Sequence, residues 1–428
     1  MKILGLDIGT TTVSAVVTEN GHVLAAETQA SHAFLPNRPA WEKAQDAAAL
    51  EALALKITDA LLSRFPEVER IGLTGQQHGI VYLDAQGRLL SPLYTWQDGR
   101  GELPYDETQS YCARLSALTG YPLATGYGMV THFYNLQNGL VPERTAAFCT
   151  IHDYLAMRLA GRSAPAIDPS DAASFGIFDV NRRRFDTDAL KRAGIDPRLL
   201  PAIAGESFLG IGTRGIPVYT AIGDNQASFL GATGGEKGCM LVNVGTGSQF
   251  SVHTPEYLVC DGLETRPFPT GGYLLAGSGL CGGRAYALLE QFFRQTAQML
   301  GLPTESCYDA MAHLLDTSPV PADPAVITPL FQGTRQNPQL RGSITNLSTD
   351  NFTPLSLLYG MMRGMAEELH GMYRRSGLAG GTLYGSGNGL RKNPHLRRCF
   401  EEAFGRPLRL SQNEEEAACG AALFASLQ

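Results

Sequence analysis

The sequence predicts an α/β protein of two similar domains that face a common catalytic cleft. The main observation is a repeat: residues 4–17 (LGLDIGTTTVSAVV) and residues 241–252 (LVNVGTGSQFSV) each read as an apolar strand, a Gly-Thr turn and a second strand. The second observation is length, because 428 residues exceed one ordinary domain and suit two domains of about 200 residues each. Third, short apolar strands alternate with amphipathic helices in both halves, which is typical of α/β folds.

Each Gly-Thr turn is a candidate phosphate site. Residues 9–10 align with residues 245–246 when Asp7 is paired with Asn243. Glycine lets a ligand approach the main chain closely, and backbone N–H groups and Thr hydroxyls converge at such a tip, which forms a phosphate cradle without a lysine. Two matched cradles predict two domains that hold one polyphosphate. The alternative interpretation is a pair of ordinary surface hairpins.

The composition describes a globular chain with an ample core. Hydrophobic residues make up 44% and charged residues 18%, and the net charge of −7 argues against a nucleic-acid surface. The basic run 182–184 is expected to be a solvated turn. Eight cysteines without a C-x-x-C pair are expected to be reduced thiols. No apolar run is long enough for a membrane span, and a strand is predicted directly at the N-terminus. We therefore expect a cytoplasmic monomer or homodimer without a membrane partner.

The first elements of the chain have clear boundary signals. Asn20-Gly21 predicts a tight turn into a strand at residues 23–27. Residues 47–65 predict a helix, with an apolar stripe at the i, i+3, i+7 and i+11 positions and Asp46 as its N-cap. A short buried strand is expected at residues 71–74.

That strand opens into residues 75–79 (GQQHG), which are followed directly by another apolar strand at 80–83. The amide of Gln77 and the imidazole of His78 would then lie at the edge of a sheet. Such groups suit a polyhydroxylated ligand, because each hydroxyl needs both a donor and an acceptor. The alternative is a buried loop whose polar side chains only satisfy backbone groups.

Residues 95–100 (TWQDGR) form the next polar segment. The face of Trp96 suits the apolar side of a sugar, and Asp98 and Arg100 suit its hydroxyls. Alternatively, Asp98 and Arg100 form a structural ion pair. Further along, the turn-rich residues 168–174 are expected to line the same cleft.

Asp224 is the candidate proton acceptor. It stands at the end of an apolar strand at 218–222, where a following helix would place its carboxylate at the cleft. A helix N-cap is the alternative role, but the second cradle follows soon after and favours catalysis. The Gly- and Pro-punctuated residues 210–217 predict the domain boundary, which gives domains of residues 1–217 and 218–428.

The second half shows one more candidate ligand loop. A strand at 382–384 leads to residues 385–389 (GSGNG) and then to a helix at 393–404, a unit that can hold a nucleotide. The pattern lacks the G-x-G-x-x-G spacing of a dinucleotide site. The other expected elements are a glycine-rich turn at 277–283, helices at 285–300 and 354–376, loops at 331–335 and 341–343, and a final helix at 414–427, capped by Asn413 and packed on the second domain.

Taken in order, these segments resemble the FGGY carbohydrate kinases of the actin/Hsp70/hexokinase superfamily of duplicated, ribonuclease H-like domains. The resemblance covers nearly the whole chain. Within the family, the stretches GLTGQQHGIVYLD, TWQD, NVGTGSQFSV and LFQGTRQNPQLRGSI are most similar to the sedoheptulokinases. Two departures are that Gln77 replaces the usual Met before His-Gly, and that the chain is shorter than is typical of the family.

The resemblance implies ATP-dependent phosphorylation of a ketose at its terminal primary hydroxyl, with ATP and Mg²⁺ as cofactors. The first domain would bind the sugar and carry the first phosphate motif, and the second would bind the nucleotide. Asp224 is expected to be the general base, exposed and near its ordinary pKa of about 4. The remaining roles are phosphate contacts by Thr10, Thr11, Gly245 and Thr246; an adenosine border of Gly385, Gly387 and Asn388; a sugar site of Gln77, His78, Trp96, Asp98, Asp224 and Asn225; and orientation of Mg²⁺ by Asp7 through water.

Sedoheptulose is the expected substrate, and pentulokinase activity on xylulose or ribulose is the alternative within the family. A non-catalytic, actin-like protein that binds sugar under nucleotide control is the alternative outside it. Such a protein would keep the phosphate cradles, but ketose would not stimulate its ATP turnover.

Overall fold

The computed structural model describes residues 1–212, 214–334, 337 and 339–428. Thr213, in the expected boundary segment, and Arg335, in the expected loop 331–335, lie outside the described residues, as do Gln336 and Pro338. The chain forms two compact units. The first unit comprises Met1–Glu236, Arg266–Gly272 and Asn413–Gln428, and the second comprises Lys237–Thr265 and Tyr273–Gln412.

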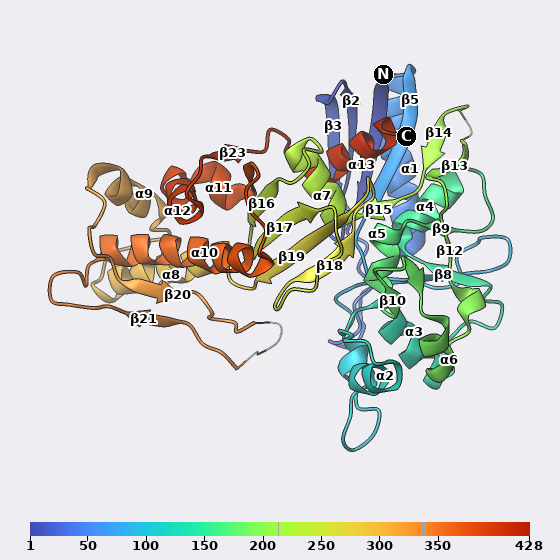
Figure 1. Ribbon diagram of the computed structural model, residues 1–428, viewed down its shortest axis with the longest axis horizontal. Helices are drawn as coiled ribbons and strands as arrows, with labels where there is room; N and C mark the ends of the chain where they lie inside the picture. Colours follow the sequence, from blue (N-terminus) through green and yellow to red (C-terminus); the bar gives the residue numbers. More distant parts are fainter. Residues whose placement is uncertain (213, 335–336, 338) are drawn as a thin grey trace. The chain divides into compact units, whose positions relative to one another are not determined.

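The first unit is built on a mixed sheet with strand order β13-β14-β5-β1-β2-β3, in which β15 also pairs with β5 (Figure 1). β1 is antiparallel to β2 and parallel to β5. The turn into β3 is the expected one, since Asn20 and Gly21 have φ of 52° and 82°. The strands are β1 (Lys2–Ile8), β2 (Thr12–Glu19), β3 (His22–Ala30), β5 (Val68–Gly75), β13 (Phe208–Ile211), β14 (Pro217–Tyr219) and β15 (Ile222–Gly223).

Helices cover this sheet and add a second hydrophobic cluster beside it. The expected helix at 47–65 is confirmed as α1 (Ala47–Arg64), and the Asp46 side chain accepts from the backbone N–H groups of Ala48 and Ala49. The other helices of the unit are α2 (Tyr111–Thr119), α3 (Gly128–Gln137), α4 (Ile151–Leu159), α5 (Pro169–Ala172), α6 (Thr187–Arg192), α7 (Asp224–Thr233) and α13 (Glu416–Ser426). The remaining strands are β4 (Ala44–Gln45), β6 (Val81–Leu83), β7 (Leu93–Tyr94), β8 (Ala147–Cys149), β9 (Ala166–Ile167), β10 (Phe178–Asp179), β11 (Arg184–Phe185) and β12 (Ala202–Ile203).

The last helix differs from the expectation, because α13 belongs to the first unit and not to the second. It packs on β1, β5 and α7, and Figure 1 shows it in red beside the blue N-terminal strands. The contact is built from small residues: a Cβ added at Gly231 would overlap the carbonyl oxygen of Glu416, and one at Gly420 would overlap that of Ala227. Asn413 is not the cap, since its side-chain amide donates to the Gly231 carbonyl instead.

This packing also explains why the first unit extends to Glu236, beyond the expected boundary at 217 and 218. α7 follows β15 and is held by α13, so both elements stay with the sheet that contains β1 and β5. The segment Arg266–Gly272 returns to the same unit from within the second half of the sequence.

The second unit contains a sheet with strand order β18-β19-β17-β16-β22-β23 (Figure 1). Its strands are β16 (Met240–Val244), β17 (Ser248–Thr254), β18 (Glu264–Pro267), β19 (Tyr273–Gly279), β22 (Leu383–Ser386) and β23 (Leu408–Leu410), and a separate pair is formed by β20 (Val326–Thr328) and β21 (Ser343–Thr345). The last two residues of β18 already belong to the segment that is counted with the first unit. The helices are α8 (Gly283–Met299), α9 (Tyr308–Thr317), α10 (Pro354–Ser376), α11 (Asn388–Lys392) and α12 (Pro394–Phe404). α10, expected at these residues, is the central helix and packs on β17, β19, β20, α8 and α12.

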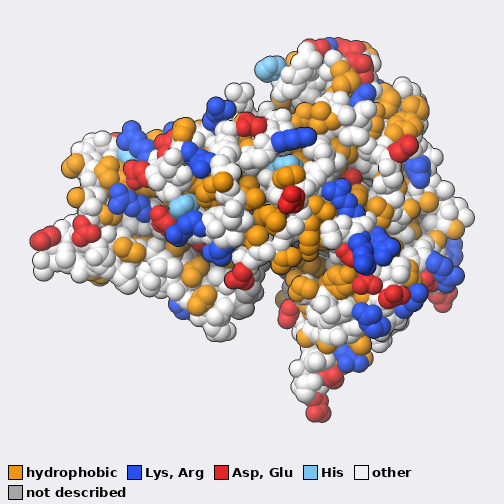
Figure 2. All heavy atoms as spheres, in the orientation of Figure 1, with side chains coloured by type: hydrophobic (Ala, Val, Ile, Leu, Met, Phe, Trp, Pro, Cys, Tyr) orange, Lys and Arg blue, Asp and Glu red, His pale blue; other side chains and the backbone are white. Residues whose placement is uncertain are grey.

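The surface agrees with the composition. On the face shown in Figure 2, acidic, basic and apolar side chains are interspersed. Among the helices of the described residues, none is both long and apolar enough to cross a membrane.

Candidate active site

The first Gly-Thr turn connects β1 to β2, and its backbone is hydrogen-bonded to other segments of its own unit. Its carbonyl groups accept hydrogen bonds: Thr10 O from Gln45 Nε2 at 2.7 Å, and Thr11 O from the backbone N–H of Ser31 at 2.8 Å. Because these carbonyl groups are engaged, the backbone N–H groups of residues 9–11 and the hydroxyl of the exposed Thr11 are the groups of the turn that suit an anion.

Trp96 lies directly beside this turn. Its indole Nε1–H donates to Thr10 Oγ1 at 3.0 Å, and the side chain as a whole is 46% exposed. A flat aromatic surface and a phosphate-type turn are therefore neighbours within the first unit. The aromatic face suits a sugar ring or chain, and the turn suits the group that would be transferred to it.

Asp224 is the first residue of α7, and Gly223 occupies the N-cap position without a side-chain cap. The alternative N-cap role is therefore not observed. One carboxylate oxygen, Oδ2, lies 3.5 Å from the backbone nitrogen of Gln77. Burial raises the pKa of Asp224, and the charges of Arg266 and His152 oppose this shift. The expectation of an exposed carboxylate with an ordinary pKa is wrong, because the first residue of α7 is partly buried and its pKa is raised.

Asp7, at the end of β1, is electrostatically linked to Asp224. The pKa of Asp7 is raised to about 7, first by burial and then by the negative charge of Asp224. Two carboxylates that disfavour each other's ionisation stabilise a cation between or near them. The turn, Asp7 and Asp224 thus form one polar site at the ends of β1 and β15.

A buried polar layer supports this site from below. Ser170 is 1% exposed, and its carbonyl oxygen accepts from the side-chain amides of Gln77 and Gln226, each at 3.1 Å. Its hydroxyl oxygen accepts from the backbone N–H of Gly223 at 3.3 Å. Ser170 therefore joins the loop after β5 to the start of α7, which carries Asp224.

Asp171 and His152 complete the layer, and both are fully buried. His152 Nε2 lies 2.8 Å from Asp171 Oδ2. Although burial alone raises it, the pKa of Asp171 is lowered, because His152 and neighbouring hydrogen bonds stabilise its charge. Sequence reasoning placed residues 168–174 at the cleft surface and assigned His152 no role. The sequence did offer a signal for buried polar residues: His152 and Asp153 stand within an otherwise apolar stretch.

In the second unit, the Gly-Thr-Gly-Ser turn at residues 245–248 joins β16 to β17, as expected. The N-terminal end of α8 is bonded to it: Gly283 N donates to Gly245 O at 2.8 Å, and Arg284 N donates to Thr246 O at 3.0 Å. The glycines at this junction are required for packing, because a Cβ on Gly282 would overlap the carbonyl oxygen of Gly247.

The GSGNG segment lies next to this second turn. β16 and β22 are parallel neighbours, and Asn243 Nδ2 donates to Ser386 Oγ at 2.6 Å. Gly387 has φ of 84°, and a Cβ there would lie 2.5 Å from the carbonyl oxygen of Val244. A left-handed glycine at this close approach brings residues 385–388 against the end of β16. The two expected nucleotide motifs are thus adjacent within the second unit.

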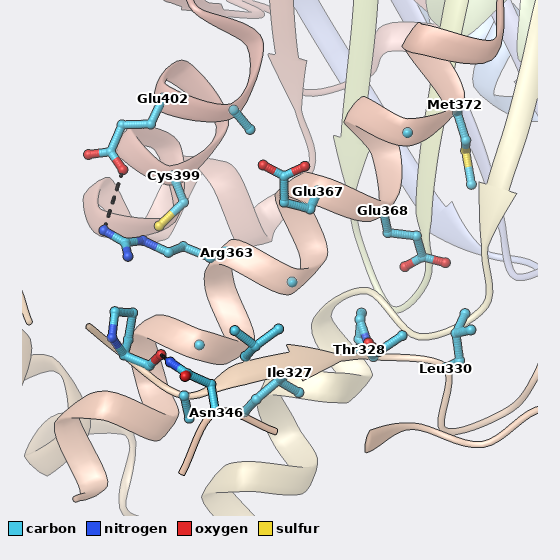
Figure 3. Close-up of a pocket in the computed structure, with 18 of the residues that line it drawn as sticks. Ile327, Thr328, Leu330, Asn346, Arg363, Glu367, Glu368, Met372, Cys399 and Glu402 are labelled. Carbon is cyan, nitrogen blue, oxygen red and sulfur yellow. Dashed lines mark hydrogen bonds and ion pairs between the residues drawn. The ribbon is translucent and has the colours of Figure 1, made fainter. Parts of the chain in front are cut away.

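The second unit also contains a cavity of about 800 Å³ along one side of α10, bounded by β20 and α12 (Figure 3). Arg363 and Glu402 form an ion pair of 3.8 Å at one end, and Glu368 faces Thr328 and Leu330 at the other. Neither residues 245–248 nor residues 385–388 line this cavity. It is therefore distinct from the two nucleotide motifs.

Comparison with known proteins decides the family. The model of the FGGY carbohydrate kinase N-terminal domain matches residues 2–231, and that of the C-terminal domain matches residues 240–428. The chain belongs to the FGGY family of carbohydrate kinases. The order of motifs along both halves therefore reflects the family's duplicated, actin-like architecture, and the chain is an ATP-dependent sugar kinase.

Individual relatives narrow the comparison. The mouse protein named sedoheptulokinase is 29% identical over 98% of this chain and 96% of its own length. The Escherichia coli xylulose kinase is 25% identical over 86% of this chain and 77% of its own length. The crystal structure of xylulose kinase from Rhodospirillum rubrum superposes with a TM-score of 0.84 at 23% identity, covering 100% of this chain and 90% of that one, which supports the fold.

Within this FGGY kinase, Asp98 does not have the environment expected of a sugar contact. It has no exposed surface, and its oxygens accept from the Arg100 guanidinium, at 2.6 Å and 3.2 Å, and from the backbone N–H of Lys43 at 3.0 Å. The alternative interpretation, a structural Asp–Arg pair, is the one observed. Gln77 is likewise only 3% exposed, and its amide is used by Ser170.

His78, Asp224 and Asn225 are the partly buried members of the expected sugar set. His78 Nδ1 lies 2.6 Å from the carbonyl oxygen of Ser174, and the ring stacks on Tyr127 with centroids 4.6 Å apart. Because a carbonyl oxygen only accepts, Nδ1 carries the proton and donates it to Ser174, and Nε2 lies at the opposite edge of the ring. Asn225 Oδ1 is buried and has no protein donor among the described residues.

The residues of the kinase fit magnesium held largely by water and phosphate. The described residues contain no group of three or more His, Cys, Asp or Glu side chains that could hold a metal ion. Asp7 offers a carboxylate whose pKa of about 7 makes it sensitive to a nearby cation. Because Mg²⁺ keeps several of its waters, one carboxylate is sufficient on the protein side.

Proposed function

We propose that this FGGY kinase transfers the γ-phosphoryl group of ATP to the terminal primary hydroxyl of a ketose, and that the ketose is sedoheptulose. The observation that carries the proposal is that Ile8, which precedes the phosphate-type turn, and Gly223, which precedes Asp224, both pair with Gly75 of β5, so the proposed proton acceptor and the turn follow the ends of strands that flank one residue. The mouse relative named sedoheptulokinase, similar over nearly the full length of both chains, supports the seven-carbon sugar.

Asp224 acts as the general base in this proposal. A primary hydroxyl is a poor nucleophile at neutral pH, so a carboxylate within reach is needed to take its proton as the new bond forms. Burial raises the pKa of Asp224, and the positive charge of Arg266 opposes this shift only in part. A carboxylate with a raised pKa binds a proton more readily, which suits a group that takes the proton of the hydroxyl.

The nucleotide is assigned to the remaining motifs. Backbone N–H groups of Thr10 and Thr11 and of Gly245 and Thr246 would hold phosphate oxygens, and Asp7 would orient Mg²⁺ through water. Gly385, Gly387 and Asn388 would border the adenosine. When bound, Mg²⁺ supplies neutralisation of the phosphate charge.

The ketose contacts are assigned to the members of the expected set that are not fully buried. Trp96 would offer the aromatic face, His78 and the amide of Asn225 would offer polar atoms, and Asp224 would receive the hydroxyl proton. We assign Gln77 a supporting role through its bond to Ser170, and we omit Asp98 because both of its oxygens bind Arg100.

The same proposal includes a cytoplasmic monomer or homodimer that binds neither nucleic acid nor membrane. The net charge of −7 supports the absence of nucleic-acid binding.

Pentulokinase activity is the second candidate, because the xylulose kinase of E. coli is also similar over most of this chain. An ADP-release assay with sedoheptulose, xylulose, ribulose, fructose and glycerol, each at several concentrations, separates the two. We expect the highest kcat/KM with sedoheptulose and a 7-phosphate product by mass spectrometry and NMR. A higher kcat/KM with xylulose or ribulose would replace the substrate assignment. ATP turnover that no ketose stimulates would refute kinase action on a ketose and favour the non-catalytic alternative.

A further inference from the structure

The indole of Trp96 makes a contact that sugar stacking does not require. Its Nε1–H donates to Thr10 Oγ1 at 3.0 Å, although the side chain is 46% exposed. The backbone of Trp96 is fixed independently, because its carbonyl oxygen lies so close to Gly126 that a Cβ there would overlap it. The indole bond therefore adds a link between the ring and the turn, beyond what holds the segment in place.

Thr10 passes this link on to a closed set of buried amides. Its hydroxyl donates to Gln76 Oε1 at 3.3 Å, and Gln76 Nε2 donates to Gln45 Oε1 at 2.9 Å and lies 3.4 Å from Gly9 O. Gln45 Nε2 returns to the turn and donates to Thr10 O at 2.7 Å. Gln45 and Gln76 are 0% and 3% exposed, so Trp96 is the exposed member of the set.

The chemistry of a hydroxyl makes this arrangement directional. A threonine hydroxyl has one proton to donate, and here that proton points to Gln76 while a lone pair accepts from Trp96. The hydroxyl of Thr10 is thus committed to the network, and its backbone N–H is what remains for a phosphate. The direction of that N–H depends on the same carbonyl bonds that Gln45 and Gln76 provide.

We propose that Trp96 is a positioning residue that couples ketose binding to the conformation of the first phosphate-binding turn through its indole N–H. This inference rests on the proposed function, since it takes the Trp96 ring as the ketose platform. A ketose that stacks on the ring restricts its rotation, so the bond to Thr10 is already formed when the phosphate arrives. The turn is then ordered at lower entropic cost.

Thermodynamic linkage makes the coupling measurable from either side. If the ketose improves the affinity for nucleotide by a given factor, the nucleotide improves the affinity for ketose by the same factor. A single hydrogen bond of this kind predicts a factor of about 2 to 12. The factor is obtained by titrating the ketose by calorimetry with and without a non-hydrolysable ATP analogue and Mg²⁺.

The test is a double-mutant cycle on the two bonded groups. Trp96→Phe keeps an aromatic face and removes the donor, and Thr10→Val keeps the shape and removes the acceptor. We expect each variant to lose the coupling factor, and the calorimetry reports separately any change in its affinity for the ketose alone. Thr10→Val also removes the hydroxyl bond to Gln76, so the double variant should lose no more coupling than Thr10→Val alone, because the indole then has no acceptor left to lose. Thr10→Ser retains the hydroxyl and should keep the coupling.

The matched control is Trp41→Phe, which changes the other tryptophan of the chain. Trp41 is partly buried beside Arg100 and makes no bond to the phosphate turn in the described structure, so this variant should keep the full coupling factor. Trp41→Phe also leaves Trp96 as the sole tryptophan, so the fluorescence of this variant reports on Trp96 alone. The fluorescence should change when Thr10→Val is added, because the indole N–H then loses its acceptor; a role of Thr10 that does not involve Trp96 would leave the fluorescence unchanged.

Three outcomes would overturn the inference: no coupling in the wild type, full coupling in Trp96→Phe, or a double variant whose loss is the product of the two single losses. Failure of the proposed function looks different, because no ketose would then stimulate ADP release in the wild type. If the wild type shows ketose-dependent turnover and Trp96→Phe keeps the full coupling factor, the positioning role is refuted and the proposed function stands.

Discussion

Replacing the carboxylate of Asp224 by an amide tests the central assignment most directly. Asp224→Asn keeps the size of the side chain and retains an oxygen that can accept from the backbone N–H of Gln77. It removes the proton acceptor, which contributes about 10² to 10⁴ to the rate in general base catalysis. Since each factor of ten is about 1.4 kcal/mol, the barrier should rise by about 3 to 5 kcal/mol. The ketose affinity should change little.

The same variant has a second effect that the structure predicts with opposite sign. The pKa of Asp7 is about 7, so about half of this carboxylate is ionised at pH 7, and the charge of Asp224 is the second cause of the shift. Removing that charge increases the ionised fraction of Asp7, by at most about twofold at pH 7. The Mg²⁺ concentration for half-maximal rate should therefore stay the same or fall, while kcat collapses.

The assay is ADP release with saturating ketose over a Mg²⁺ titration, accompanied by calorimetric binding of the ketose. Asp188→Asn is the matched control, because Asp188 is an exposed acid of the same unit whose side chain is 82% accessible. It should retain turnover within about twofold. An Asp224→Asn variant that keeps more than a tenth of the wild-type kcat would refute the base assignment. A variant that needs much more Mg²⁺ would refute the electrostatic link to Asp7.

Three further predictions follow from the same geometry. At subsaturating Mg²⁺, the rate should rise with pH through about 7, because Asp7, with its raised pKa, is protonated at lower pH; a flat rate profile between pH 6 and 8 would contradict this. Gly420→Ala should destabilise the protein by about 1 to 3 kcal/mol or more, because its Cβ would overlap the carbonyl of Ala227, whereas Gly205→Ala, with open space around it, should change the urea midpoint little. Asp98→Asn should lower the free energy of unfolding by about 3 to 5 kcal/mol, because it removes the negative charge that pairs with the buried Arg100 guanidinium, and it should leave the ketose KM of the folded enzyme unchanged; a raised KM in a stable protein would return Asp98 to the sugar site.

Local signals in the sequence were sufficient to predict the helices whose ends are fixed by their own capping residues. The helix at α1 has its stripe and its Asp46 cap, and α10 begins with Thr353 as N-cap and ends before the left-handed Gly377. The two Gly-Thr turns were found because each is a short motif with strands on both sides. Such features depend on neighbours within a few residues along the chain.

The position of α13 depends on a different kind of contact. Its surface toward α7 is made of glycine and alanine, so hydrophobic periodicity gives no indication of which sheet it will cover. What selects the first unit is the absence of side chains at Gly231 and Gly420, which lets backbones approach closely. Small-residue complementarity between segments that lie far apart in sequence is not visible in either segment alone.

The candidate site shows the same division. Motif spacing selected Asp7, Asp224, Trp96 and the turns as candidates, but polarity alone could not separate residues that face a ligand from residues that support them. Gln77 was expected to face a sugar at the edge of the sheet, but it is buried and its amide donates to the carbonyl oxygen of Ser170, far along the chain. Burial is a property of the assembled unit, and it decides which polar residue is available.

The clearest case is Arg266, whose charge acts on Asp224 from a segment that follows β17 in the sequence and returns to the first unit. Because Arg266 lowers the pKa of Asp224, Arg266→Gln should raise it, so a larger fraction of the base is protonated at a given pH. The acidic limb of the kcat/KM profile should then move to higher pH, with the plateau at alkaline pH approached in both enzymes. Arg182→Gln, in the exposed turn before β11, is the charge-matched control and should leave the limb in place. A limb that stays put in Arg266→Gln, or moves to lower pH, would show that the proton acceptor is not the carboxylate this arginine faces.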